Sequence, residues 1–147
     1  MTENTSLSVD DFTEEEIRLM LDNLDAYEAE EQVEIEKIAD IIESRKTAKA
    51  CFDDLIEFCK AMQDDYKVGK HHRMLADELM GIAAGTKDRV CVNIPPRHGK
   101  SQLVSIYYPA WFIGKFPNKK ILMVSHTSDL AVDFGRKVRN IIDSPTY

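Results

Sequence analysis

The chain has 147 residues, of which 44% are hydrophobic and 31% charged, and its formal net charge is −7. This apolar share excludes a fully disordered chain, and the length fits one globular domain. No apolar run approaches the roughly 18 residues that cross a bilayer, and the N-terminus MTENTSLSVDDF lacks the basic and apolar regions of a secretory signal. Three cysteines without a CxxC pair argue against a disulfide framework or a zinc site and favour the cytoplasm.

Charge is divided unevenly along the sequence. Residues 1–65 hold 20 acidic and 6 basic residues, whereas residues 66–147 hold 6 acidic and 13 basic residues. Such asymmetry indicates a solvated acidic segment beside a region that meets anions. The acidic half is either the solvated face of helices or a functional surface. In the second case it repels nucleic acid, docks on a basic partner or shields the basic half until assembly.

The acidic half is predicted to be helical. We expect a flexible tail over residues 1–12 and an acidic helical segment over residues 13–66. Thr13 and Glu16 have the spacing of a capping box, which marks a helix start. Apolar residues then recur at helical spacing, and the first Gly or Pro is Gly69. One long helix or two to three shorter ones are therefore expected.

Residues 67–147 are predicted to alternate helices with strands. Near-continuous apolar runs, typical of strands buried on both faces, occur at residues 87–94 and 120–125. Helices are expected over residues 71–85, 100–112 (with Pro109 either kinking or shortening this helix) and 128–142. A helix between two such strands implies an α/β fold with parallel strands and right-handed crossovers.

The string VNIPPRHGKS, residues 92–101, carries the clearest chemical signal. Gly99 lets the backbone bend closely around a phosphate, Lys100 can reach β- and γ-phosphates, and the Ser101 hydroxyl can bind Mg²⁺. The free amides at the start of the expected helix also favour an anion. The string is a variant of the Walker A motif, because Ile94 replaces its first glycine. The alternative is an ordinary turn between a strand and a helix. The candidate nucleotide-binding residues are Pro96, Arg97, His98, Gly99, Lys100, Ser101 and Gln102.

The neighbouring side chains have alternative interpretations. Arg97 can stabilise charge on a transferred phosphoryl group, which makes Arg97 and Lys100 the candidate catalytic residues, or it is a surface arginine. His98 either binds phosphate or fills the loop, and we favour the second. His71 and His72 are adjacent, so on a helix they should point in different directions and not share a metal ion.

Three strings resemble the large, ATPase–nuclease subunit of phage terminases. They are HHRMLADEL, VNIPPRHGKSQLVSIYYPAWFIGKFP and ILMVSHTSDLAVDFGRKVRNII, and together they cover about residues 71–147, about half of the chain. The resemblance implies an incomplete P-loop NTPase core in which Gly99, Lys100 and Ser101 form the Walker A motif and Arg97 matches the family's extra arginine. His71, His72 and Arg73 stand where the family has an adenine-contacting motif usually built on Gln.

The resemblance also implies an activity and its partners. Terminase large subunits are ATP-driven motors that package viral DNA into the procapsid, with ATP and Mg²⁺ as cofactors. The implied partners are double-stranded DNA, the portal, the terminase small subunit and further copies of the chain, without a membrane. The implied compartment is the cytoplasm of the infected host cell.

Part of the family's machinery has no counterpart in this sequence. After Ser125 there is no apolar strand ending in Asp-Glu, the Walker B motif, and no nuclease domain. We therefore expect an N-terminal portion of such a subunit, with weak or no ATPase activity of its own. The alternatives are another P-loop NTPase of the helicase or kinase kind, and a non-catalytic fragment that acts through its acidic helices.

Overall fold

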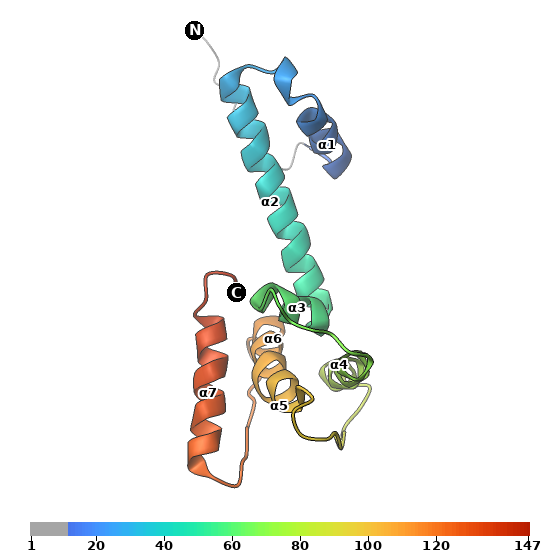
Figure 1. Cartoon of the computed structure of the whole chain (residues 1–147), viewed down its shortest axis with the longest axis vertical. Helices are drawn as coiled ribbons and strands as arrows, with labels where there is room; N and C mark the ends of the chain where they lie inside the picture. Colours follow the sequence, from blue (N-terminus) through green and yellow to red (C-terminus); the bar gives the residue numbers. More distant parts are fainter. Residues whose placement is uncertain (1–11) are drawn as a thin grey trace. The chain divides into compact units, whose positions relative to one another are not determined.

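A computed structural model describes residues 12–147, so all but the last residue of the expected tail lies outside the described residues. Contacts divide the chain into two units, with the boundary between Lys49 and Ala50, and we describe each unit by itself. The colours of Figure 1 follow the helices in chain order. They are α1 (Glu14–Asp22), η2 (Leu24–Ala26), α2 (Ala29–Asp53), α3 (Leu55–Met62), α4 (Lys70–Ala83), α5 (Lys100–Gln102), η3 (Leu103–Tyr107), α6 (Tyr108–Lys115) and α7 (Ser128–Ile142).

The first unit consists of α1, η2 and most of α2, which confirms the prediction of helices here. The capping box is present, because the Glu16 amide donates to Thr13 Oγ1 at 3.3 Å and the Thr13 amide donates to Glu16 Oε2 at 2.8 Å. Among residues 12–49 of this unit, Ile17, Ile35 and Ile38 are buried. Most acidic side chains of α1 and α2 are exposed, as expected for a solvated face.

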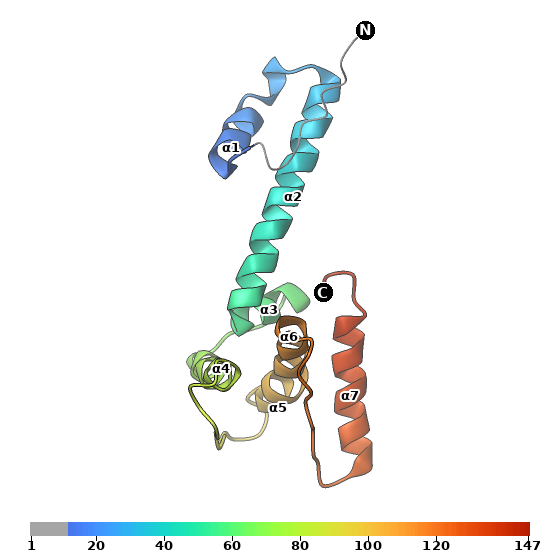
Figure 2. The ribbon, with the colours of Figure 1, turned by 180° about the vertical axis from the view of Figure 1, so that it is seen from behind.

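In the second unit, α5, η3 and α6 follow one another without a break and form a central helical stretch (residues 100–115). Helices α4 and α7 lie on opposite sides of this stretch in the two views of Figures 1 and 2, and α3 also packs on it. Leu103 and Ala110 on the stretch are fully buried, as are Leu55 and Cys59 on α3. The core of the unit is therefore a helix-on-helix interface.

The predicted α/β fold, an incomplete P-loop NTPase core with parallel strands, is wrong, because the described residues contain helices and no strand. Residues 88–95 and 119–125 are neither helical nor paired with another segment. Their side chains nevertheless alternate as in a strand. Val92 and Ile94 pack on the core, whereas Cys91 and Asn93 are exposed. Met123 also packs on the core, whereas Leu122 and Val124 are 88% and 83% exposed. The apolar pattern identified segments suited to strands, but a sheet also requires a neighbour for each backbone, and the described chain provides none.

Pro109 does not end the central helical stretch. The ring of a proline inside a helix clashes with the preceding turn and removes one amide donor. Here the turn before it, η3, is a π-helix, and Pro109 is buried in the first turn of α6. The wider π turn accommodates the ring, so the helix continues to Lys115 rather than stopping near residue 112.

The lengths and apolar character of the helices bear on whether one of them could span a membrane. None of those in residues 12–147 is long and apolar enough to cross a membrane.

We predict that Leu122→Lys reduces self-association of the chain. Leu122 lies in a segment with unpaired backbone groups and an exposed apolar side chain, which together favour strand pairing between copies. Sedimentation velocity should show a shift toward monomer. The control is Val132→Lys, which removes a 59% exposed side chain from α7, where the backbone is hydrogen-bonded. An equal effect of both substitutions would contradict the role of the unpaired backbone.

We predict that stability falls as the pH rises above 9. Burial raises the pKa of the Cys59 thiol from 9.0 to about 12, and burial also raises the pKa of Tyr66 above its usual value of 10.0. For each group, at a pH between its pKa in the unfolded chain and its higher pKa in the folded chain, the unfolded chain loses a proton that the folded chain retains. The free energy of unfolding therefore decreases as the pH rises. For Cys59 the loss over this window is on the order of 4 kcal/mol.

Urea unfolding at pH 7 to 11 measures this dependence. Cys59→Ala should flatten the fall between pH 9 and 10, whereas Cys91→Ala, at an exposed site, should not. A stability that is constant over the range would contradict the prediction.

Candidate functional site

The loop before the central helical stretch has a backbone conformation that few side chains adopt. Gly99, the residue before the helix, has φ +74°, and Arg97 has φ +65°. Arg97 is the one residue other than glycine with positive φ in residues 12–147. Alternation of left-handed residues with their neighbours turns successive amides toward one side and can form an anion-binding nest. We call residues 95–101 the candidate phosphate loop.

The first turn of α4 holds this loop through His72. The Gly69 amide donates to Nδ1 of His72 at 3.0 Å, so Nε2 of the same ring carries the proton and donates to the His98 carbonyl at 3.1 Å. His98 in turn bonds through Nδ1 to the Pro96 carbonyl at 2.8 Å. A hydrogen bond from the His72 imidazole therefore connects the loop to a helix that is far away in the sequence.

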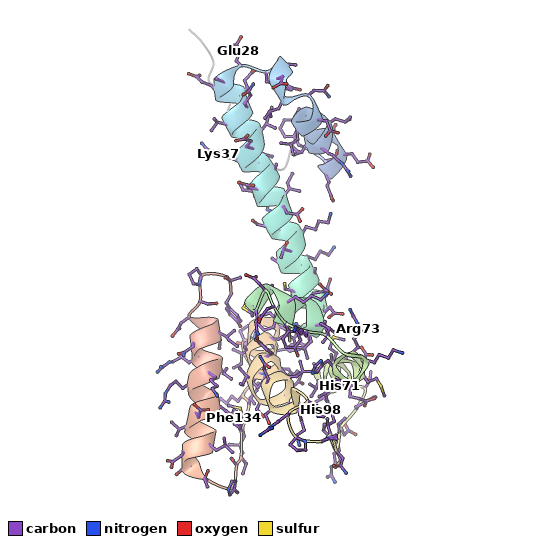
Figure 3. The ribbon with its side chains drawn as sticks, in the orientation of Figure 1. Glu28, Lys37, His71, Arg73, His98 and Phe134 are labelled. Carbon is purple, nitrogen blue, oxygen red and sulfur yellow. The ribbon has the colours of Figure 1, made fainter. Side chains whose placement is uncertain are left out.

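His71 and His72 lie closer than the sequence predicted. Their Nε2 atoms are 3.2 Å apart and their ring centroids 4.0 Å apart. The expectation assumed side chains radiating from a regular helix, but His72 folds back to cap the first turn of α4. Figure 3 shows His71 and His98 close to one another beside the loop, with ring centroids 5.9 Å apart. No group of three metal-ligating side chains occurs in residues 12–147.

The helix start leaves backbone donors and two cations available. The Leu103 amide donates to the Gly99 carbonyl at 3.0 Å as the first bond of the helix. The amides of residues 100–102 precede this bond and have no acceptor within the helix, so they favour an anion. Within the described chain neither Arg97 nor Lys100 forms an ion pair. A phosphate placed here would meet positive charge without breaking an existing pair.

The predicted residues have different environments. Pro96, Arg97, His98 and Ser101 are exposed, whereas Gly99 and Lys100 are half-buried at the bend into the helix. Gln102 is half-buried and belongs to a hydrogen-bond network rather than to the loop. The structure thus brings six of the seven candidates together around one turn, and directs the seventh toward α3.

The Gln102 network is a feature that the sequence pattern did not reveal. Gln102 Nε2 donates to Gln63 Oε1 at 2.8 Å and to the Tyr107 hydroxyl at 3.3 Å. Tyr107 also donates to Gln63 Oε1 at 2.7 Å. Gln63 is 39 residues before Gln102 and ends α3. Gln63 is followed by Asp64 and Asp65, so no local pattern in the sequence distinguishes it from a solvated polar residue.

The residues present do not form a resident Mg²⁺ site. Ser101 offers one exposed hydroxyl, and the candidate phosphate loop contains no carboxylate. Octahedral Mg²⁺ is usually held by one or two carboxylates together with substrate phosphates. Ser101 is therefore at most a single ligand to a metal ion carried by a bound nucleotide, and we derive no chemical step through Mg²⁺.

We predict that Gly99→Ala destabilises the loop more than Gly85→Ala does. Both glycines have φ +74°, so the backbone strain of an alanine destabilises the fold by roughly 1 kcal/mol at either site. At Gly99 the added Cβ would also lie 2.4 Å from His72 Nε2, whereas at Gly85 it would meet nothing within 4 Å. We expect an additional loss of about 1–2 kcal/mol in urea unfolding of the Gly99 variant. Equal losses at the two sites would contradict close packing of His72 on the loop.

No family model, curated protein or solved structure matches the chain.

Proposed function

We propose that the chain is the ATP-binding portion of a DNA-packaging motor of the terminase large-subunit kind, in which the candidate phosphate loop holds the triphosphate of ATP. The observation that carries the nucleotide part of this proposal is the helix start at Gly99 with free amides and unpaired cations. The motor part depends on the strings PPRHGKS, PAW and FGRKVR. In this function the chain acts in the host cytoplasm with double-stranded DNA, the portal, the small subunit and further copies of itself.

In this proposal each residue of the candidate phosphate loop has a separate role in binding the phosphates of ATP. The amides of residues 100–102 and Lys100 hold the terminal phosphates by charge-assisted hydrogen bonds. Arg97, exposed two residues before Gly99, adds a second cation that can follow charge developing on the transferred phosphoryl group. His72 keeps the backbone bend in place through the His98 carbonyl. His98 itself is a loop-filling residue, because its ring bonds to the Pro96 carbonyl.

The same geometry predicts binding without efficient hydrolysis by this chain. Hydrolysis requires a group that orients the attacking water and carboxylates that hold the metal. Within residues 12–147 no acidic side chain pairs with Lys100 or Arg97, and no metal-binding cluster occurs. The ATPase and nuclease activities therefore belong, in this proposal, to the assembled motor.

Titration of ¹⁵N-labelled chain with ATP and with tripolyphosphate tests the proposal. Both ligands should shift the amide resonances of residues 99–102 at micromolar to millimolar concentration, in a saturable and salt-sensitive manner. Sodium sulfate at equal ionic strength is the control for non-specific anion binding. Absence of saturable shifts at these four residues with either ligand would overturn the nucleotide function.

A second candidate function is docking through the first unit. Leu19 and Leu21 on α1, and Val33 and Ile41 on α2, are exposed by 39 to 63% among acidic side chains. An acidic surface with apolar residues suits a basic, partly apolar protein partner. Loss of partner binding on Val33→Asp, with the loop resonances unresponsive to ATP, would favour this function over the first.

A further inference from the structure

A cleft of about 540 Å³ opens beside the candidate phosphate loop, between the central helical stretch and α7. Ser101 and Gln102 from the first helical turn line one side of it. Phe134, Lys137 and Asn140 of α7 line the other side, and Figure 3 shows Phe134 on that helix. Its volume falls in the range of roughly 300–1,000 Å³ that small-molecule sites occupy. The cleft thus begins where the loop ends.

The walls of the cleft suit a flat, partly polar group. Ile106, Phe134 and Ile141 provide apolar contacts, and an aromatic ring can stack on the face of any base. Lys137 is held by Asp133 Oδ2 at 2.8 Å, which fixes a cation on the α7 side. Asn140 is exposed on α7 and makes no side-chain hydrogen bond within the described chain. Its amide therefore remains able to bind a ligand.

The orientation of the Gln102 amide follows from a chain of hydrogen bonds. The carboxylate of Asp65 can only accept, so Gln63 directs Nε2 toward Asp65 Oδ1 at 2.7 Å and Oε1 toward Gln102. Gln102 must then present its NH₂ group to Gln63 and Tyr107. Its Oε1 carries no hydrogen bond within the described residues. Gln102 lines the cleft, and its side chain has a free acceptor and no spare donor.

We propose that this cleft binds the adenine base of the nucleotide whose phosphates occupy the loop, an inference that rests on the proposed function. The exocyclic amino group of adenine donates to Gln102 Oε1. Guanine carries a carbonyl oxygen at that position, which would oppose another acceptor. Phe134 supplies the stacking contact and Asn140 completes the polar edge. The cleft thereby distinguishes ATP from both GTP and a bare polyphosphate.

Calorimetric titration of the full chain with ATP, GTP and tripolyphosphate tests this assignment. ATP should bind at least about tenfold more tightly than either of the others. Phe134→Ala and Asn140→Ala should each lower the affinity for ATP about three- to tenfold and leave the affinity for tripolyphosphate unchanged. Asn140 is exposed, so its replacement by alanine should not disturb the packing of the core. The Asn140→Ala variant therefore still tests the cleft if the Phe134→Ala variant does not fold. Val132→Ala, an exposed position on α7 outside the cleft, is the matched control.

The outcomes separate the cleft from the loop. Equal affinities for the three ligands, with no effect of the two variants, would overturn the adenine site and leave the phosphate loop intact. If neither ATP nor tripolyphosphate binds, the proposed function is wrong. Titration with adenosine then tests whether the cleft binds an adenine base on its own. Saturable shifts of the Phe134 and Asn140 resonances with millimolar adenosine would support the cleft, and unshifted resonances would overturn it.

Discussion

Replacing Lys100 with alanine should weaken binding of ATP and of tripolyphosphate by roughly 10- to 100-fold, because a hydrogen bond to a charged group contributes about 1.5–3 kcal/mol. The side chain is half-buried at the helix start and forms no ion pair within residues 12–147. Its loss should therefore change affinity without a comparable loss of stability. Isothermal titration at low and moderate salt measures the affinity, and urea unfolding measures the stability.

Two further substitutions make this result specific to the site. Lys100→Arg keeps the charge and should recover part of the affinity, since a guanidinium donates in a different geometry. Lys119→Ala removes an exposed lysine beyond the opposite end of the central helical stretch and should have little effect. If Lys119→Ala and Lys100→Ala weaken binding equally, the anion is attracted by overall charge and not by the loop.

Replacing Trp111 with alanine should be the most destabilising substitution in the second unit, with a loss of about 3–5 kcal/mol. Trp111 is 4% exposed, and its indole Nε1–H donates to the Cys51 carbonyl at 2.9 Å. Lys115 Nζ also lies 4.8 Å from the ring centroid. The alanine variant leaves a cavity between α6 and the end of α2, and it removes the donor from the carbonyl of the half-buried Cys51. A loss of this size is a large share of the total stability of a small domain, about 5–15 kcal/mol.

Chemical denaturation followed by circular dichroism at 222 nm measures this effect, because Trp111 is the one tryptophan of the chain and its fluorescence is lost in the variant. Trp111→Phe keeps most of the apolar volume and removes the hydrogen bond, so it should cost about 1–2 kcal/mol. A loss below about 1 kcal/mol for Trp111→Ala would mean that the site collapses to fill the cavity.

Local features of the fold were predictable from the sequence. The Thr13–Glu16 capping box involves residues three apart, and the structure confirms it. Helix α4 ends before Gly85, as predicted, because glycine adopts the left-handed conformation there without a Cβ clash. Helix α7 covers residues 128–142, as its apolar spacing indicated. In each case the residues that decide the structure are neighbours along the chain.

The absence of a sheet from the described residues could not be predicted in the same way. Residues 120–125 have the composition of a buried strand, yet Leu122 and Val124 are exposed. Composition and alternation report whether a segment suits an extended backbone. They do not report whether a second segment lies within hydrogen-bonding distance, which depends on the path of the whole chain.

In the candidate site too, features set by neighbouring residues were predictable and features set by distant residues were not. Gly99 at the helix start was predicted from its place before Lys100 and Ser101, and its positive φ is as the loop requires. The bond from His72 to the His98 carbonyl joins residues 26 positions apart, and no spacing rule connects them. The orientation of Gln102 depends on Gln63, which reaches it from another helix.

The sequence by itself determined most of the helices, the Thr13–Glu16 capping box and the left-handed glycine before the central helical stretch, since these depend on residues within one or two turns of each other. The tertiary structure alone decided that the apolar segments are unpaired, that one imidazole holds the loop and that a cleft adjoins it. These features arise from contacts between distant segments, whose formation depends on packing geometry and not on local preference.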